Sequence, residues 1–401
     1  MRKTVIVSAL IVSLICSGCQ TGIEQQLKVL KHQNLQMSLV KKAKYFEEDL
    51  KEHISPEGLC WYRLSKRGDR YFVACSALSD AAYMTGCLLG AEALRYEVTG
   101  SEDAKEKLIK LANGLHILQE ITGRKGYFAR AFCKKCKEEV WAESWFEGKD
   151  KYEEYIWRGN TSKDQYTPVM FGYFLAYEAV KDKPEMQEIR DQISEDVSNI
   201  ADFLIDNKYK IIGEQGITKD GNLSPRILGI PIMGLDALHC LTWIKIAEVI
   251  TGRERFKKAY DDLVREGLPG IVACPLSFYD RPWPFRETDY VNNNMAFLDF
   301  YAILRIANNE EKYYQRGLQN RFFWKKIVKY PFWNFAYAAF CQSNKSKEKA
   351  VKEGVESLTK FTLKPGRFWG IEEREEVKYA GSAFLLAYWV GRNHGFISAN
   401  Q

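Results

Sequence analysis

The chain has few histidines and lacks the short motifs of several common chemistries. Its 401 residues include only five His, and none of these are paired at the spacing that metal sites use. The sequence contains no glycine-rich phosphate loop, no GxSxG elbow around a nucleophilic serine and no HExxH zinc motif. These absences set aside phosphate-cradling, serine-nucleophile and zinc-protease chemistry. We expect no cofactor and no bound metal.

A basic patch and a flexible linker are also missing. The formal net charge is only +6, and the basic residues are interleaved with acids, so we expect no nucleic-acid partner. No glycine- or serine-rich stretch divides the chain, which predicts one domain over residues 19–401. A hydrophobic content of 46%, with 13% aromatic residues, is enough to bury a large core.

One long apolar run occurs, and it lies at the start of the chain. A charged start, Met1-Arg2-Lys3, precedes the apolar residues 4–15, which are too few for a lasting transmembrane helix. The following Cys16-Ser17-Gly18-Cys19 resembles the lipobox of bacterial lipoproteins, with Cys16 where those proteins usually have Leu. The resemblance implies a signal peptide over residues 1–18, a lipidated Cys19 and a chain held at the membrane of the cell envelope, facing the periplasm or the exterior. An ordinary cleaved secretory signal is the alternative.

The cysteines suggest no strong metal site. Cys60 and Cys75 flank a predicted β-hairpin over residues 61–73, and the two thiols are placed to pair in an oxidising compartment. Cys133 and Cys136 form a lone CxxC, for which a disulfide, two free thiols or structural zinc stay open. Two further thiols lie in apolar segments and are expected to be buried and free: Cys87 and Cys240.

Six segments are apolar nearly all round and alternate with amphipathic ones. A helix that is apolar on every side must be buried on every side. The unequal spacing of these segments disfavours a solenoid of fixed period and places long loops before the buried helices. We therefore predict an all-α fold, an (α/α)6 toroid of about six helical hairpins, with a short β-hairpin near the N-terminus. The predicted buried helices start near Asp80, Asp164, Leu235, Tyr290, Phe332 and Lys378. Small residues that would let neighbours approach closely are Gly86, Gly90, Ala91, Gly172, Gly381 and Ala383.

Two acids stand at matching places in this pattern. Asp80 opens one predicted buried helix, Asp164 opens the next, and in both cases a tyrosine follows within three residues. Glycoside cleavage needs one carboxyl group to protonate the leaving oxygen and often a second to activate water or stabilise the cation. Two carboxyl groups on adjacent helices fit that need. Helix capping by an acid in the first turn, with Thr161 and Asp164 as a capping box, is the competing interpretation.

Other polar and aromatic residues near the predicted helix starts are candidates for contacts with a sugar. A long aromatic loop over residues 122–162 is expected to form a lid or a wall beside the site. His239 is also a candidate proton carrier, although a satisfied core histidine is the favoured interpretation, and an arginine in the loop over residues 274–290 suits a sugar carboxylate. Packing alone would explain any one aromatic residue. The candidates are Tyr83, Trp157, Gln165, Tyr166, Asp236, His239, Arg286, Asn292, Trp333 and Tyr379.

With these features in place, the chain resembles the six-hairpin glycosidase superfamily. That family includes unsaturated glucuronyl and rhamnogalacturonyl hydrolases, and the resemblance covers residues 40 to 393 as architecture. It implies catalysis by Asp80 and Asp164 on oligosaccharides that carry uronic acids. The DQY context around Asp164 departs from what those hydrolases show. A polysaccharide lyase or sugar epimerase, and a non-catalytic lipoprotein that binds a glycan or a partner, are the alternatives.

Overall fold

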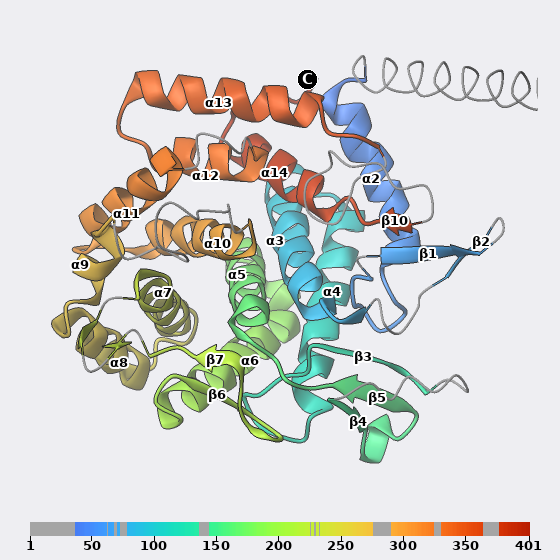
Figure 1. Cartoon of the computed structure of the whole chain (residues 1–401). Helices are drawn as coiled ribbons and strands as arrows, with labels where there is room; N and C mark the ends of the chain where they lie inside the picture. Colours follow the sequence, from blue (N-terminus) through green and yellow to red (C-terminus); the bar gives the residue numbers. More distant parts are fainter. Residues whose placement is uncertain are drawn as a thin grey trace, which may run out of the picture.

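The computed structural model describes residues 37–61, 63–67, 70–72, 78–135, 144–224, 226–227, 230–231, 233–275, 290–324, 330–363 and 377–401. The predicted signal peptide and Cys19 therefore lie outside the described residues. Within the described part the chain is mostly helical, with a few short antiparallel strands (Figure 1). None of the helices seen there has the length and apolar character needed to cross a membrane.

The described part of the chain contains the following helices and strands, given in chain order. The α-helices are α2 (Leu39–His53), α3 (Ala81–Thr99), α4 (Glu102–Glu120), α5 (Lys163–Val180), α6 (Gln187–Asp206), α7 (Gly234–Thr251), α8 (Glu254–Arg265), α9 (Leu268–Ala273), α10 (Tyr290–Ile306), α11 (Glu311–Trp324), α12 (Pro331–Phe340), α13 (Asn344–Thr359) and α14 (Ser382–Asn393). The strands are β1 (Arg63–Arg67), β2 (Arg70–Phe72), β3 (Ala131–Lys134), β4 (Trp145–Glu147), β5 (Tyr155–Arg158), β6 (Lys210–Gly213), β7 (Gly216–Asn222), β8 (Arg226–Ile227), β9 (Ile230–Pro231) and β10 (Val377–Tyr379).

The apolar segments form buried helices, as the pattern predicts. In α3 every residue from Ala81 to Tyr96 is buried, and the helix ends at Gly100, whose φ of 61° places it in the left-handed region that favours glycine. Five of the six predicted starts agree with the structure within one residue. The sixth helix was predicted from Lys378 but begins at Ser382, because residues 377–379 instead form β10 and pair with β1.

The buried helices contact one another in a defined order. α3 contacts α5 and α14, α7 contacts α5 and α10, and α12 contacts α10 and α14. Each also packs against an amphipathic helix: α4 on α3, α6 on α5, α8 on α7, α11 on α10, α13 on α12 and α2 on α14. The apolar stripes of the amphipathic helices α4 and α6 are buried, for example at Leu108, Leu115, Ile193 and Ile200.

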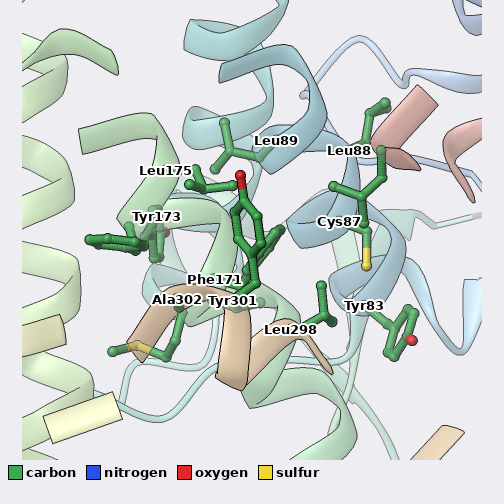
Figure 2. Packing of buried hydrophobic residues seen from close by; sticks show 14 of the residues in the cluster. Tyr83, Cys87, Leu88, Leu89, Phe171, Tyr173, Leu175, Leu298, Tyr301 and Ala302 are labelled. Atoms are coloured by element: carbon green, nitrogen blue, oxygen red, sulfur yellow. The ribbon is translucent and has the colours of Figure 1, made fainter. Parts of the chain in front are cut away.

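The helices α3 and α5 approach closely enough for backbone contact. A Cβ atom on Gly86 would lie 2.3 Å from the Pro168 carbonyl oxygen, and one on Gly172 would lie 2.4 Å from the Gly86 carbonyl oxygen. Only glycine leaves that space, as the small residues predicted. Figure 2 shows side chains of α10 beside those of α3 and α5, with the Tyr301 ring centred 6.0 Å from the Phe171 ring.

The strands form small sheets beside the helices. β1 and β2 make the predicted hairpin, and β10 joins it to give the order β10-β1-β2. Residues 122–162, expected to be a lid or wall loop, instead carry the antiparallel sheet β3-β5-β4. Strands of only three or four residues give too short an alternation to be recognised in sequence.

The first described helix is fixed to the last ones. The Lys42 ammonium on α2 donates to the carbonyl oxygens of Thr359 at 2.6 Å and Phe361 at 3.0 Å, at the end of α13. Burial lowers the pKa of Lys42 to about 8. The Val40 amide donates to the Gln401 carbonyl oxygen at 3.3 Å. The two ends of the described chain are therefore packed together.

The close contact between α3 and α5 predicts a large effect of one methyl group. Gly86→Ala forces a Cβ atom against backbone that cannot rotate away, so we expect the free energy of unfolding to fall by about 2 to 3 kcal/mol. Gly270→Ala is the matched control, because a Cβ there meets nothing within 4 Å, and alanine in a helix is favoured by up to about 1 kcal/mol. Urea denaturation of both variants tests this, and equal stabilities would contradict the backbone contact.

Candidate functional site

Asp80 precedes α3, and its carboxylate faces an arginine from a distant segment. The Arg130 guanidinium lies 3.2 Å from Asp80 Oδ1, and the exposed fractions of the two side chains are 17% and 10%. Asp80 is the N-cap residue of α3, yet its side chain makes no capping hydrogen bond. The carboxylate is therefore committed to a charge pair and not to the helix end.

Asp164 lies in the first turn of α5, where a different residue performs the capping. Ser162 and Gln165 form a capping box, in which the Ser162 amide donates to Gln165 Oε1 at 3.1 Å. The predicted box of Thr161 and Asp164 is therefore one residue out of register. Asp164 instead accepts a hydrogen bond from the Ser162 hydroxyl and is partly exposed.

Arg130 connects the two acids. Its Nη2 faces Asp80, and its Nη1 donates to Ser162 Oγ at 3.3 Å, so Asp80, Arg130, Ser162 and Asp164 form one continuous chain of polar contacts. The same guanidinium donates to the carbonyl oxygens of Ser79 and Asn160. Burial lowers the pKa of Arg130, and the Asp164 carboxylate acts in the opposite direction. Arginine still keeps its charge under these conditions.

A second charge pair continues the site toward α7. The Lys163 ammonium lies 2.8 Å from Asp236 Oδ1, and the exposed fractions of these side chains are 19% and 5%. Lys163 is the neighbour of Asp164 at the start of α5, and Asp236 lies in the first turn of α7. Arg130 and Lys163 are thus paired with the acids at the starts of α3 and α7, and Asp164 follows Lys163 directly in the sequence.

A network of hydrogen bonds between uncharged side chains joins α3 to α10 and α12. The Asn294 amide donates to the Tyr83 hydroxyl at 2.6 Å, and the Trp333 indole donates to Asn294 Oδ1 at 3.0 Å. Burial raises the pKa of Tyr83 well above its ordinary value, and the charge of Asp164 contributes to the rise. Tyr83 is therefore a neutral phenol near the acids. The Trp333 ring also stacks on Phe297 and on Tyr290.

His239 lies deeper, among the buried helices. Its Nδ1 is 2.5 Å from Asp299 Oδ2, and the Trp243 indole donates to the other oxygen of Asp299 at 3.2 Å. Both His239 and Asp299 are fully or almost fully buried, and burial raises the pKa of Asp299. The histidine is one helical turn from Asp236 but belongs to a separate polar cluster between α5, α7 and α10.

The remaining candidate residues lie in different parts of the structure. Tyr166 is fully buried in the core between Phe128 and Trp243. Trp157 lies in β5, and Tyr379 lies in β10. Asn292 is partly exposed in the first turn of α10, whereas Arg286 lies outside the described residues. Cys87 and Cys240 are buried as predicted and Cys60 is buried too, whereas Cys75 and Cys136 are outside the described residues.

The main groups that sequence reasoning missed are Arg130, Lys163 and Asn294. Arg130 follows α4 in a segment without periodicity, 50 residues from Asp80, so no local pattern marks it. Lys163 stands directly beside Asp164, and that adjacency was a usable signal. Asn294 belongs to an unusual run of three asparagines that opens a buried helix. Across the part of the chain that is described, no three His, Cys, Asp or Glu side chains are grouped to hold a metal.

The contacts of Arg130 predict a measurable coupling between two buried charges. Arg130→Met leaves the Asp80 carboxylate buried without its cation, and we expect the free energy of unfolding to fall by about 3 kcal/mol. Adding Asp80→Asn removes the stranded charge, so the double variant is expected to lose at least about 1 kcal/mol less than the sum of the single ones. Chemical denaturation of the four proteins measures this difference.

An exposed arginine pair provides the control. Arg253 lies 2.8 Å from Asp202 on the surface, where the arginine side chain is 46% exposed. Arg253→Met is expected to change the free energy of unfolding by less than about 1 kcal/mol. Additive losses for Arg130 and Asp80 would show that the two groups do not interact.

No protein-family model matches this chain, and no curated protein matches its sequence. Its chemistry therefore has to be inferred from the arrangement of Asp80, Asp164 and their partners.

Proposed function

We propose that this protein is a carbohydrate-active enzyme, a glycoside hydrolase that acts on oligosaccharides containing uronic acids. One observation carries the proposal. Asp80 and Asp164, at the starts of two adjacent buried helices, are joined through Arg130 and Ser162, and neither carboxylate serves as a helix cap. The main competing explanation was that these acids cap their helices, but both carboxylates make other contacts instead.

The surroundings of the two acids suit different roles. Asp80, held against the Arg130 guanidinium, suits the ionised partner that accepts a proton from the attacking water or stabilises the developing cation. Asp164, partly exposed and hydrogen-bonded to the Ser162 hydroxyl, suits the acid that donates a proton to the leaving oxygen. In this scheme the glycosidic C–O bond breaks as Asp164 protonates its oxygen, and water supplies the new C–O bond.

An acidic sugar fits the cation beside these acids. Lys163 is partly exposed and adjacent to Asp164, and among the described residues it is paired with a single carboxylate, that of Asp236. A uronate carboxylate placed near Lys163 would gain a charge-assisted hydrogen bond. The predicted contribution of Arg286 to the same carboxylate is part of this proposal.

The contact order of the helices supports an (α/α)6 toroid as the architecture. The successive contacts of α3, α5, α7, α10, α12 and α14 return from α14 to α3, and each buried helix carries one amphipathic partner. Such a ring brings the first turns of its buried helices to one end. This is the arrangement of the six-hairpin glycosidases that the sequence resembles.

Non-catalytic binding of a glycan is the second candidate, and the Asp80–Arg130 pair favours it. A carboxylate already paired with a guanidinium at 3.2 Å is a weaker base than a free one. The polar first turns would then serve to bind hydroxyl groups only. Binding of an oligosaccharide without turnover would select this function.

The proposed chemistry predicts that both acids are required for turnover. We expect Asp80→Asn and Asp164→Asn each to lower kcat by at least about 100-fold on uronic-acid-containing oligosaccharides. Asp202→Asn, on α6 and paired with surface arginines, is expected to leave kcat unchanged. Turnover is measured by reducing-end release from a panel of saturated and unsaturated oligosaccharides, with circular dichroism to confirm folding.

Each contrary result has a distinct meaning. Turnover that persists in both aspartate variants would remove these acids from the mechanism. Release of an ultraviolet-absorbing product from a saturated polymer would replace hydrolysis by a lyase reaction.

We also propose that the chain is exported and anchored through a lipid on Cys19. The support is the sequence of residues 1–19 alone. Cys19→Ser is expected to abolish incorporation of labelled fatty acid and to release the protein from the membrane fraction of a bacterial host. Cys16→Ser is the control and should leave the label in place. Equal labelling of Cys19→Ser and the unaltered chain would contradict the anchor.

A further inference from the structure

A large cleft lies beside the sheet β3-β5-β4. Figure 1 shows this sheet near its lower edge. Its volume is about 910 Å³, which is large enough for two or three sugar rings. It lies between the segment that ends α4 and the sheet. We name this the β-sheet cleft, and it is lined by Glu120 to Arg124, Phe146, Glu147, Lys149 to Tyr152, Trp157 and Glu214.

Two aromatic rings form one wall of the β-sheet cleft. The centroids of Phe146 and Trp157 are 4.8 Å apart, and their planes are inclined by 34°. The Trp157 indole donates to the Glu147 carbonyl oxygen at 3.3 Å, which fixes its orientation. Phe146 is partly exposed, whereas Trp157 is buried behind it. Such a wall suits the apolar face of a sugar ring.

The charges around the β-sheet cleft nearly balance. Its lining holds three cationic and four acidic side chains, and several of them are already paired: Lys151 with Glu120 at 2.9 Å, and Arg124 with Glu214 at 3.5 Å. A ligand with a net charge would meet no excess of the opposite sign that could repay its desolvation. Hydroxyl groups, which both donate and accept, can bond to carboxylates and ammonium groups alike. The lining therefore favours an uncharged, polyhydroxylated ligand.

A segment beside the β-sheet cleft has an unusual backbone conformation. A Cβ on Gly159 would lie 2.5 Å from Glu214 Oε2 and 2.9 Å from the Phe146 ring, so glycine allows both to approach the chain there. Ser144 and Asn160 have φ angles of 77° and 56°, a conformation that non-glycine residues seldom adopt. The Gly159 amide donates to the Ser144 carbonyl oxygen at 2.8 Å. Strain of this kind is often kept at binding sites.

Asn160 also connects the cleft to the acids. It lines a small adjoining pocket that shares Phe146 and Glu214 with the cleft. Its carbonyl oxygen accepts a hydrogen bond from Arg130 at 3.2 Å, and Arg130 is the partner of Asp80. Within the described chain, consecutive contacts through Asn160 and Arg130 therefore connect the wall of the β-sheet cleft to Asp80.

We propose that the β-sheet cleft binds uncharged sugar residues of a glycan whose acidic sugar lies at Asp80 and Asp164. This proposal extends the proposed function, and it depends on that function only for the acidic end of the glycan. The Phe146 ring stacks on a sugar face, and Glu214 and Glu147 accept hydrogen bonds from its hydroxyl groups. The protein then recognises a chain of mixed composition and not an isolated uronic acid.

Binding without turnover tests this assignment separately from catalysis. Isothermal titration of the Asp164→Asn protein with cellohexaose, xylohexaose, mannohexaose and maltohexaose is expected to show binding of at least one of them. Phe146→Ala, added to Asp164→Asn, is expected to raise that Kd about tenfold through loss of stacking. Glu214→Gln is expected to raise it by a similar factor. Tyr313→Ala, at an aromatic side chain on α11 that is 38% exposed, is the matched control and should leave Kd unchanged.

The outcomes separate this proposal from the one before it. Binding of a neutral hexasaccharide that weakens in Phe146→Ala supports the cleft even if no substrate is ever cleaved. Absence of binding by all four neutral probes, or binding that is insensitive to both Phe146→Ala and Glu214→Gln, overturns it. Preference of the cleft for oligogalacturonate over every neutral probe, lost in Phe146→Ala, also overturns it, because the ligand would then be charged.

Discussion

The backbone contact between α3 and α5 determines where the site lies. Gly86 and Gly172 bring the two helices together with no side chain between them, and the residues at the start of each helix are therefore fixed relative to one another. Asp80 and Asp164 occupy those positions. Arg130 and Ser162 then span the remaining gap with hydrogen bonds. Without the close approach of the helices, one guanidinium would not reach both helix ends.

The helices were predictable because the degree of burial of a helix determines the pattern of apolar residues in its sequence. A segment such as 81–96 is apolar on every face, and an amphipathic segment such as 187–206 shows a clear stripe. The short strands have no comparable sequence pattern. β3, β4 and β5 hold three or four residues each, and their pairing depends on segments that the local pattern does not relate. The sheet was therefore interpreted as a loop.

The site was predictable only in part, because its acids are local features and their partners are not. An aspartate before a buried helix stands out in sequence, whereas the capping box that begins at Ser162 differs by one residue from the alternative based on Thr161. That single step decides whether Asp164 caps its helix or accepts a hydrogen bond from the Ser162 hydroxyl. Arg130 and Asn294 contribute contacts over 50 and 211 residues of sequence. Tertiary structure alone reveals them.

The union of the two ends of the described chain has a consequence for synthesis. Lys42 reaches its carbonyl partners across more than 300 residues of sequence, and β1 pairs with β10. During translation Lys42 lacks these carbonyl partners, and β1 lacks β10, until residues 359–379 have left the ribosome. Contacts of such long sequence separation slow folding. The face of α2 that packs on α14 therefore stays exposed longer than the face of α3 that packs on α4 and α5, and a chaperone that covers α2 in this interval would raise the yield of folded protein.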